Sequence, residues 1–183
     1  MQKKVLSEID LYWGDIKTPK GFEIKRDVIK NNILNSFIKE KRISNNIKDY
    51  SYSDYQLEYF QSHQWLQDYI RDHFRADYNR TLIPKLSWGN VYEYNQKSFS
   101  RANVDPLDLR NAPDYTFIYG VDVGQDSTGI IIEYDDNRRK GRSWHFPLNN
   151  NEFVIFPSTN QYFISPNKSK QMNIILTTTY EFI

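Results

Sequence analysis

Cysteine is absent from this chain of 183 residues. Its absence excludes disulfide bonds, thiolate nucleophiles and metal sites built on cysteine, such as zinc fingers and iron–sulfur clusters. Histidine is scarce as well, since His63, His73 and His145 are the only three in the sequence. Any metal chemistry must therefore combine a few imidazoles with oxygen ligands.

An excess of either charge is also missing, because 24 basic residues stand against 23 acidic ones and the net charge is +1. Such a balance produces no overall field that would attract nucleic acid or an anionic membrane. The chain has no apolar run of about 18 residues, and residues 1–10 mix charged and apolar positions rather than forming a secretory core. We therefore expect a soluble protein without a membrane partner.

Aromatic side chains are plentiful, with 14 Tyr, 11 Phe and 4 Trp making up 16% of the chain. These large rings can supply the buried apolar area that a hydrophobic fraction of only 39% leaves short. The length fits one domain that buries its core without a metal or a disulfide. We predict a single domain over residues 1–183.

Two amphipathic helices are predicted within residues 1–84. Residues 27–41 carry apolar side chains at four-residue steps, which is typical of a helix packed on one side. Ser53 and Gln56 have the spacing of a capping box, which predicts a second helix from about residue 54 to residue 77.

Beyond Pro84 the pattern changes to short apolar or alternating segments that are separated by turn residues. A series of short strands without intervening helices is typical of a sandwich or barrel-like β domain, which we place at residues 85–183. The predicted strands are 90–94, 115–123, 129–134, 143–148, 152–156, 161–165 and 171–182.

Three stretches of this β region carry a resemblance to a known family. Asn103-Val104-Asp105 follows a Tyr-rich strand, residues 115–121 form the next strand, and residues 153–158 end in Phe-Pro-Ser. In this order they resemble the Fe(II)/2-oxoglutarate oxygenases of the prolyl-hydroxylase kind, most closely uncharacterised members encoded by marine bacteriophages. The resemblance covers residues 88–183. It implies a mainly β fold, a double-stranded β-helix or jelly roll, buttressed by the two N-terminal helices.

The iron-binding positions that the resemblance implies are altered in this sequence. Such enzymes carry a His-x-Asp pair and a distal histidine; here Asn103 stands at the first histidine, Asp105 keeps the carboxylate, and Tyr162 stands at the distal histidine. A facial triad needs two neutral imidazoles and one carboxylate. An amide oxygen is a weak donor, and a phenol with a pKa of about 10 is a poor ligand at neutral pH. We expect these to be vestigial positions that bind no metal, unless His145 supplies a replacement imidazole.

The resemblance also implies a basic residue that grips the far carboxylate of 2-oxoglutarate. Lys170, or alternatively Lys168, stands at a suitable distance after Tyr162. Both lysines lie in a Pro-Asn-Lys-Ser-Lys turn, and a solvated turn lysine is the competing interpretation.

Other polar groups point to no further chemistry. The basic run 138–142 is interpreted as a solvated turn rather than a phosphate site, so nucleic acid is not expected as a partner. His63 and His73 lie ten positions apart on the predicted second helix, which does not place them on one metal-binding face. Asp105, Asp108, Asp114 and Asp122 lack the spacing of a calcium loop and are interpreted as turn carboxylates.

Three functional hypotheses follow. The first is a non-catalytic, oxygenase-like structural or assembly component, of the neck or tail region of a phage virion, with other protein subunits as partners and with the virion or host cytoplasm as its location. The second is an atypical Fe(II)/2-oxoglutarate dioxygenase in which Asp105 and His145 hold the metal and Lys170 binds the cosubstrate. The third is a jelly roll that binds a glycan or a peptide through exposed aromatic rings. We expect no enzymatic activity, and no Fe(II) or 2-oxoglutarate cofactor outside the second hypothesis.

Overall fold

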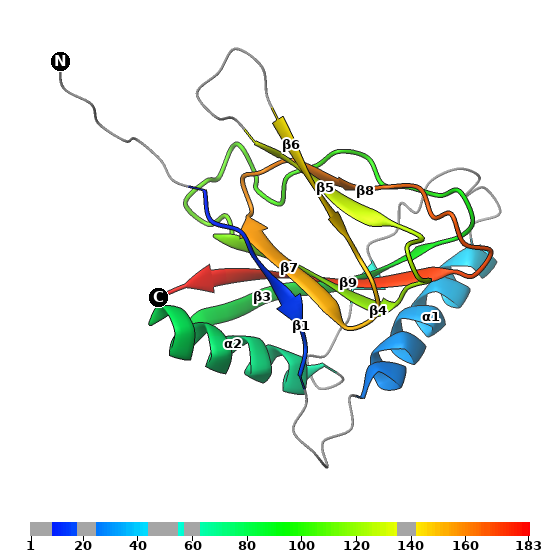
Figure 1. Ribbon diagram of the computed structural model, residues 1–183, viewed down its shortest axis with the longest axis horizontal. Helices are drawn as coiled ribbons and strands as arrows, with labels where there is room; N and C mark the ends of the chain where they lie inside the picture. The colour runs from blue at the N-terminus through cyan, green and yellow to red at the C-terminus, as the bar shows by residue number, and fades with distance from the viewer. Residues whose placement is uncertain (1–8, 18–24, 44–54, 57–62, 135–141) are drawn as a thin grey trace.

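The computed structural model of the protein describes residues 9–17, 25–43, 55–56, 63–134 and 142–183. Within this part of the chain, two antiparallel sheets face each other (Figure 1). The larger sheet has the strand order β1-β7-β4-β9-β3-β2, and the smaller sheet has the order β6-β5-β8. The strands are β1 (Tyr12–Asp15), β2 (Tyr55–Gln56), β3 (Leu82–Tyr92), β4 (Tyr115–Asp122), β5 (Gly129–Tyr134), β6 (Arg142–Pro147), β7 (Glu152–Pro157), β8 (Tyr162–Ile164) and β9 (Asn173–Phe182).

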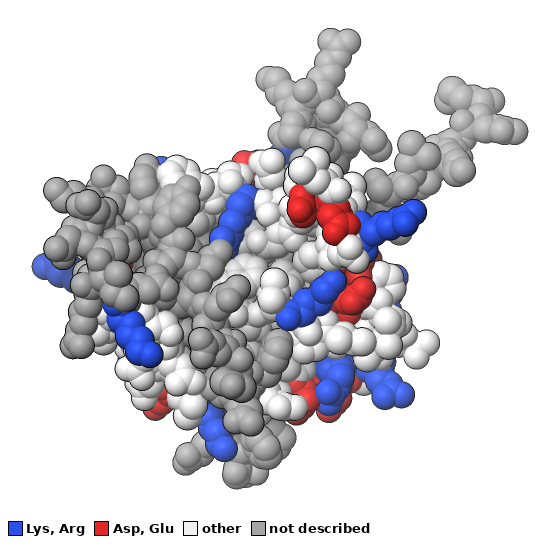
Figure 2. Space-filling model, turned by 180° about the vertical axis from the view of Figure 1, so that it is seen from behind, with Lys and Arg blue, Asp and Glu red and all other residues white. Residues whose placement is uncertain are grey.

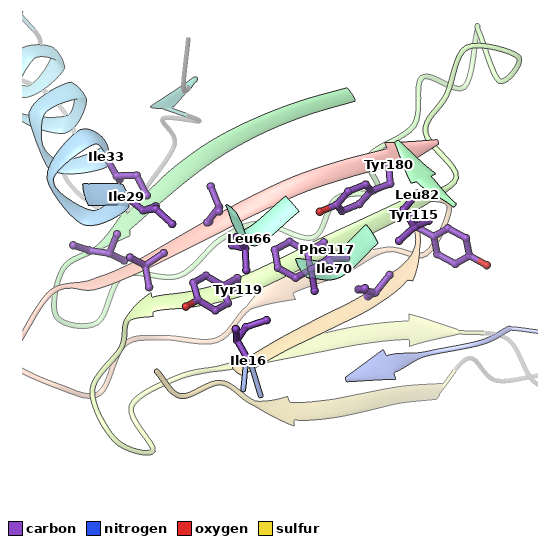
Figure 3. Close-up of a cluster of buried hydrophobic side chains, with 14 of the residues drawn as sticks. Ile16, Ile29, Ile33, Leu66, Ile70, Leu82, Tyr115, Phe117, Tyr119 and Tyr180 are labelled. Atoms are coloured by element: carbon purple, nitrogen blue, oxygen red, sulfur yellow. The ribbon is translucent and has the colours of Figure 1, made fainter. Parts of the chain in front are cut away.

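Helices α1 (Arg26–Ile43) and α2 (Gln64–Tyr78) cover the outer face of the larger sheet, opposite the smaller one (Figure 1). Figure 3 shows how apolar side chains of both helices meet the rings of β4 and β9. The approach of α1 is close, because a Cβ atom on Gly89 of β3 would lie 2.3 Å from Cγ1 of Ile33. Glycine at this position therefore lets the helix rest on the sheet.

A second apolar cluster fills the space between the two sheets. Successive residues of a strand point to opposite faces, so β9 contributes Ile174 and Leu176 to the helix side and Ile175 to the interior between the sheets. The Ile-rich β5 supplies Ile130 and Ile132 to the same interior. Apolar side chains therefore fill the space between the two sheets.

The predicted strands correspond to β3 through β9, although several boundaries differ. The capping-box prediction is wrong, because Tyr55–Gln56 forms β2 and α2 begins only at Gln64. Pairing with Gly89 and Trp88 of β3 holds this segment in an extended conformation and overrides the local helix signal. Likewise, Pro84 does not close a helical region but lies within β3, at a register shift towards β9 where a missing N–H is tolerated.

The buried imidazole of His63 precedes the first turn of α2 and predicts a specific pH dependence of stability. Burial lowers its pKa from the ordinary 6.5 to about 4, so the folded protein favours the neutral ring. Between these two values the unfolded chain binds a proton that the folded chain does not, and stability falls as the pH falls. We expect the titration of His63 to lower the free energy of unfolding by about 2 kcal/mol between pH 7 and pH 5, because a difference of one pKa unit corresponds to about 1.4 kcal/mol.

Urea unfolding of the parent and of His63→Leu at both pH values measures this term. All other titratable groups are the same in the two proteins, so the difference between the pH dependences of their stabilities isolates the contribution of His63. Parallel pH profiles for the two proteins would contradict the assignment.

Candidate functional site at the barrel mouth

Asn103 and Tyr162 meet where the chain after β3 runs beside β8. Arg101 and Tyr162 pair in antiparallel fashion, with both backbone N–H···O distances at 2.9 Å. The backbone N–H of Asn103 then donates to the carbonyl of Ser158 at 3.0 Å. This pairing brings together two residues that lie 59 positions apart in the sequence.

The side chains at this junction form one hydrogen-bonded network. Asn103 Nδ2 donates to the hydroxyl of Tyr162 at 3.1 Å and to Oγ1 of Thr116 at 3.0 Å. Arg101 Nε donates to the same Tyr162 hydroxyl at 3.1 Å, and Thr116 shares a 2.9 Å hydrogen bond with Ser158. Tyr162 is only 2% exposed and its ring packs on Phe156. The phenol and the amide therefore hydrogen bond to each other.

Asp105 lies two residues further along and is exposed. Its Oδ1 accepts a hydrogen bond from the backbone N–H of Leu107 at 2.9 Å, so the carboxylate caps a turn. Of the other acidic residues, Asp108 accepts within the same loop from Asn111, whereas Asp114 accepts from the N–H of Phe182 and Asp122 pairs with Lys30 of α1. The interpretation as turn carboxylates agrees with the contacts of Asp105 and Asp108, whereas Asp114 and Asp122 contact residues that are distant in the sequence.

A pocket of about 410 Å³ opens beside Asn103 and Asp105. The guanidinium of Arg101 stacks over the ring of Trp88 in its wall, with Cζ 5.4 Å from the ring centroid. Two buried polar atoms of the wall, Nε1 of Trp88 and Oγ1 of Thr179, have no hydrogen-bond partner in the described part of the chain. The lining residues are Lys85, Leu86, Trp88, Ala102, Asn103, Val104, Asp105, Asn111, Pro113 and Thr179.

Thr178 and Thr179 are adjacent on β9, but the hydroxyl of Thr179 has no hydrogen-bond partner in the described part of the chain, whereas that of Thr178 has two. We therefore expect a Thr→Val substitution to have opposite effects on stability at the two positions. Thr179→Val removes a buried hydroxyl without a partner, and we expect it to stabilise the protein by about 1 kcal/mol. Thr178→Val is expected to cost about 1–3 kcal/mol, because Thr178 bonds to Gln67 Nε2 at 3.0 Å and to Ser87 at 2.8 Å. Chemical denaturation of both variants provides the measurement. Equal changes in the two free energies of unfolding would contradict the prediction.

The donors at this site do not fit Fe(II). Asn103 and Tyr162, the positions at which the resemblance implies imidazoles, hydrogen bond to each other, and Asp105 is the single carboxylate among the three residues. No group of three His, Cys, Asp or Glu side chains suited to a metal ion occurs within the described residues. An iron centre of the facial-triad type has no ligand set here.

His145 cannot supply the missing imidazole at this site. His145 of β6 pairs with Ile131 of β5, and Ile131 in turn pairs with Phe163 of β8. Directly paired residues share a face of the sheet, whereas Tyr162 points to the opposite face. His145 and Tyr162 therefore lie on opposite faces of the smaller sheet. His73 belongs to α2 and His63 is the residue that caps its N-terminus, so both lie beyond the larger sheet.

Lys170 and Lys168 are exposed in the connection between β8 and β9, and neither lines the pocket beside Asn103. This connection is anchored by Asn167, whose Nδ2 donates to the carbonyl of Tyr92 at 2.9 Å. Tyr92 ends β3, while Leu86 and Trp88, nearer its start, line the pocket. The structure thus does not bring the lysines to the other site residues.

The basic run 138–142 lies, apart from Arg142, outside the described residues. On the face shown in Figure 2, acidic and basic side chains of the described residues lie interspersed on the right-hand part of the surface. No helix in the described part of the chain is both long and apolar enough to span a membrane.

Sequence reasoning missed Arg101, Trp88 and Thr116 as parts of this site. Arg101 is a single charge in a polar segment, and only its position two residues before Asn103 suggests that the two side chains share a face. The hydroxyl of Thr116 and the ring of Trp88 look in the sequence like ordinary strand residues.

Solved structures share this architecture. A non-heme alpha ketoglutarate dependent carbocyclase, SnoK from nogalamycin biosynthesis, is 10% identical with a TM-score of 0.61, and the match covers 92% of this chain and 78% of that one. The viral collagen prolyl hydroxylase of Paramecium bursaria Chlorella virus-1 is 12% identical with a TM-score of 0.60, covering 93% and 94%. A prolyl hydroxylase from Trichoplax adhaerens is 13% identical with a TM-score of 0.56, covering 92% and 83%.

The chain has the double-stranded β-helix fold of these oxygenases. The fold predicted from the sequence is thereby confirmed. No protein-family model matches the chain, and no curated protein matches its sequence. At such low identity the likeness concerns the fold, and activity has to be argued from the site itself.

Proposed function

We propose that this protein is a non-catalytic member of the oxygenase fold that serves as a structural or assembly component. The observation that supports the proposal is the hydrogen bond between Asn103 and Tyr162, two positions that the resemblance assigns to metal ligands, together with the hydrogen bond that Arg101 donates to Tyr162. Asn103 Nδ2, the hydroxyl of Tyr162 and Asp105 Oδ1 each take part in a hydrogen bond within the chain. The scaffold remains while the ligands have been replaced.

Within this proposal, the assembly is a bacteriophage particle and the neck or tail region is its place. The support is the resemblance of residues 88–183 to phage-encoded proteins of this fold. Mass spectrometry of purified particles tests this location, because a structural component copurifies with them in a fixed ratio.

The carboxylate of Asp105 allows a sharp test against the alternative, an atypical dioxygenase. Protein expressed with added iron is purified without chelator, and its metal content and 2-oxoglutarate turnover are measured. We expect substoichiometric iron and no turnover above background in the parent and in Asp105→Ala, because one carboxylate does not retain Fe(II).

Asp108→Ala is the matched control, since Asp108 is an exposed carboxylate in the same loop. Stoichiometric iron in the parent and in Asp108→Ala, combined with its loss in Asp105→Ala, would overturn the proposal and support the dioxygenase. An active oxygenase of the same fold, assayed in parallel, shows that iron and cosubstrate were supplied correctly.

A further inference from the structure

Helix α2 and the edge strand β1 enclose a second pocket, of about 140 Å³, on the helix-covered side of the larger sheet. Its walls are mainly aromatic, with Tyr12 of β1, Phe153 of β7, and Tyr69, Phe74 and Tyr78 of α2. The junction of Asn103 and Tyr162 lies on the other side of this sheet, where Tyr162 joins the apolar cluster between the two sheets. The two pockets are therefore separate.

Three of these rings are fixed against one another at steep angles. Tyr12 lies edge-on to Phe74 and to Tyr78, with ring centroids 4.7 Å apart in both pairs and interplanar angles of 72° and 62°. Phe74 and Tyr78 are tilted by 50° at 4.9 Å. Rings tilted in this way leave part of their faces uncovered, and the face of an aromatic ring is its negative side. Such faces attract a cation placed within about 6 Å of the ring centroid.

The free edge of β1 adds hydrogen-bond acceptors to the pocket. The N–H of Ile16 donates to the carbonyl of Asn151 at 3.0 Å, so Ile16 and every second residue before it form the hydrogen-bonded pairs with β7. The peptide groups of Trp13 and Asp15, two residues that line the pocket, therefore point away from β7. No strand in the described part of the chain pairs with β1 on that side.

Tyr69 limits what can reach this edge. Its hydroxyl accepts the next outward N–H, that of Lys17, at 3.2 Å, and its ring stacks on that of His73 with centroids 3.9 Å apart. The helix thus covers the edge beyond Asp15 and blocks the addition of a whole strand. The pocket has room for a single chemical group.

Asp77 gives this pocket a negative charge. It follows Tyr69 and His73 at four-residue steps on the same face of α2, and its carboxylate has no hydrogen bond or ion pair within the described part of the chain. None of the described residues that line the pocket is a lysine or an arginine. Arg80, just beyond α2, is engaged elsewhere, because it donates to the hydroxyl of Tyr115 at 3.2 Å and lies over the ring of Phe182.

We propose that this pocket binds a guanidinium group. A guanidinium ion is planar, weakly hydrated and rich in N–H donors, so it can stack on a ring while it donates to a carboxylate and to carbonyl oxygens. The pocket offers the carboxylate of Asp77 and the outward carbonyls of Trp13 and Asp15 as these acceptors. A quaternary ammonium ion would leave all of them unpaired. The inference does not depend on the proposed function, because the pocket is separate from the barrel mouth.

Titration of the full chain with ethylguanidinium and with ethylurea, its neutral isostere, tests the inference. We expect ethylguanidinium to bind at least roughly tenfold more tightly, because ethylurea lacks the charge that the rings and Asp77 attract. Nuclear magnetic resonance measures both affinities and locates the site, since the signals of Tyr12, His73 and Tyr78 should shift together.

Two variants separate the charge from the rings. Asp77→Asn keeps the shape of the side chain and should lose most of the preference for ethylguanidinium. Asp72→Asn is the matched control, since Asp72 is exposed on α2, pairs with Arg71 at 3.2 Å and does not line the pocket. Tyr78→Leu keeps an apolar side chain without the ring and should weaken binding roughly threefold. Circular dichroism confirms that each variant is folded.

A tripeptide with blocked ends and one central arginine distinguishes two sources of the guanidinium group. Tighter binding of the peptide than of ethylguanidinium identifies an arginine side chain of a partner chain, and weaker binding identifies a small guanidine; both support the inference. Equal affinities for ethylguanidinium and ethylurea, or a preference that Asp77→Asn leaves unchanged, would overturn it.

Discussion

A variant carrying Asn103→His and Tyr162→His is expected to bind a divalent metal ion that the parent chain does not retain. The two side chains already touch, with Nδ2 of Asn103 3.1 Å from the Tyr162 hydroxyl. Asp105 lines the same pocket as Asn103. Two imidazoles and one carboxylate at these positions would recreate the ligand set of a facial triad.

The expected gain in affinity is large. Loss of one group outside the coordination shell of a metal site costs roughly 10–100-fold in affinity, so two added ligands should gain more than that. Cobalt(II) titration, followed by its visible absorption and by calorimetry, measures the gain. Circular dichroism checks that the new histidine at position 162 is accommodated.

The control for this experiment is the same double variant with Asp105→Ala, which should lose most of the gained affinity. A folded double variant that binds no more tightly than the parent chain would show that the register placing Asn103, Asp105 and Tyr162 at the metal positions is wrong. Binding that does not depend on Asp105 would indicate a site elsewhere on the protein.

Phe117→Ala is expected to lower the free energy of unfolding by about 3–5 kcal/mol, the range for removing a large ring from a packed core. Phe117 is 0% exposed and lies between the helices and the sheets. Its ring centroid lies 5.8 Å from that of Phe153 and 6.1 Å from those of Tyr119 and Tyr180. Figure 3 shows the side chains of Phe117, Tyr119 and Tyr180 in this cluster. Truncation therefore opens a cavity at the point where β4, β7 and β9 share their rings.

Urea or thermal unfolding measures this loss, and Phe99→Ala serves as the control because Phe99 is 46% exposed. The control should cost well under half as much, since little buried area disappears. Similar losses in both variants would contradict the placement of Phe117 at the centre of the core.

The sequence alone determined most of the strands of the β domain. Runs such as Gly129-Ile-Ile-Ile and Phe153-Val-Ile-Phe define strands because β-branched and aromatic side chains suit a buried sheet. Turn residues between these runs mark the ends of the strands. The absence of histidine at positions 103 and 162 is likewise a fact of the sequence, and it already argues against a facial triad.

Only the tertiary structure decided which polar groups act together and what the N-terminal segments do. Local signals predicted a helix at Ser53 and Gln56, yet strand pairing with β3 prevailed at Tyr55–Gln56, because long-range hydrogen bonds outweigh a local cap. The register of β5 turned His145 away from Tyr162. The pairing of β8 with the chain after β3 also placed Tyr162 beside Arg101 and Asn103. The absence of histidine at positions 103 and 162 could be read from the sequence, whereas the hydrogen bond between Asn103 and Tyr162 depended on a contact across 59 residues of chain.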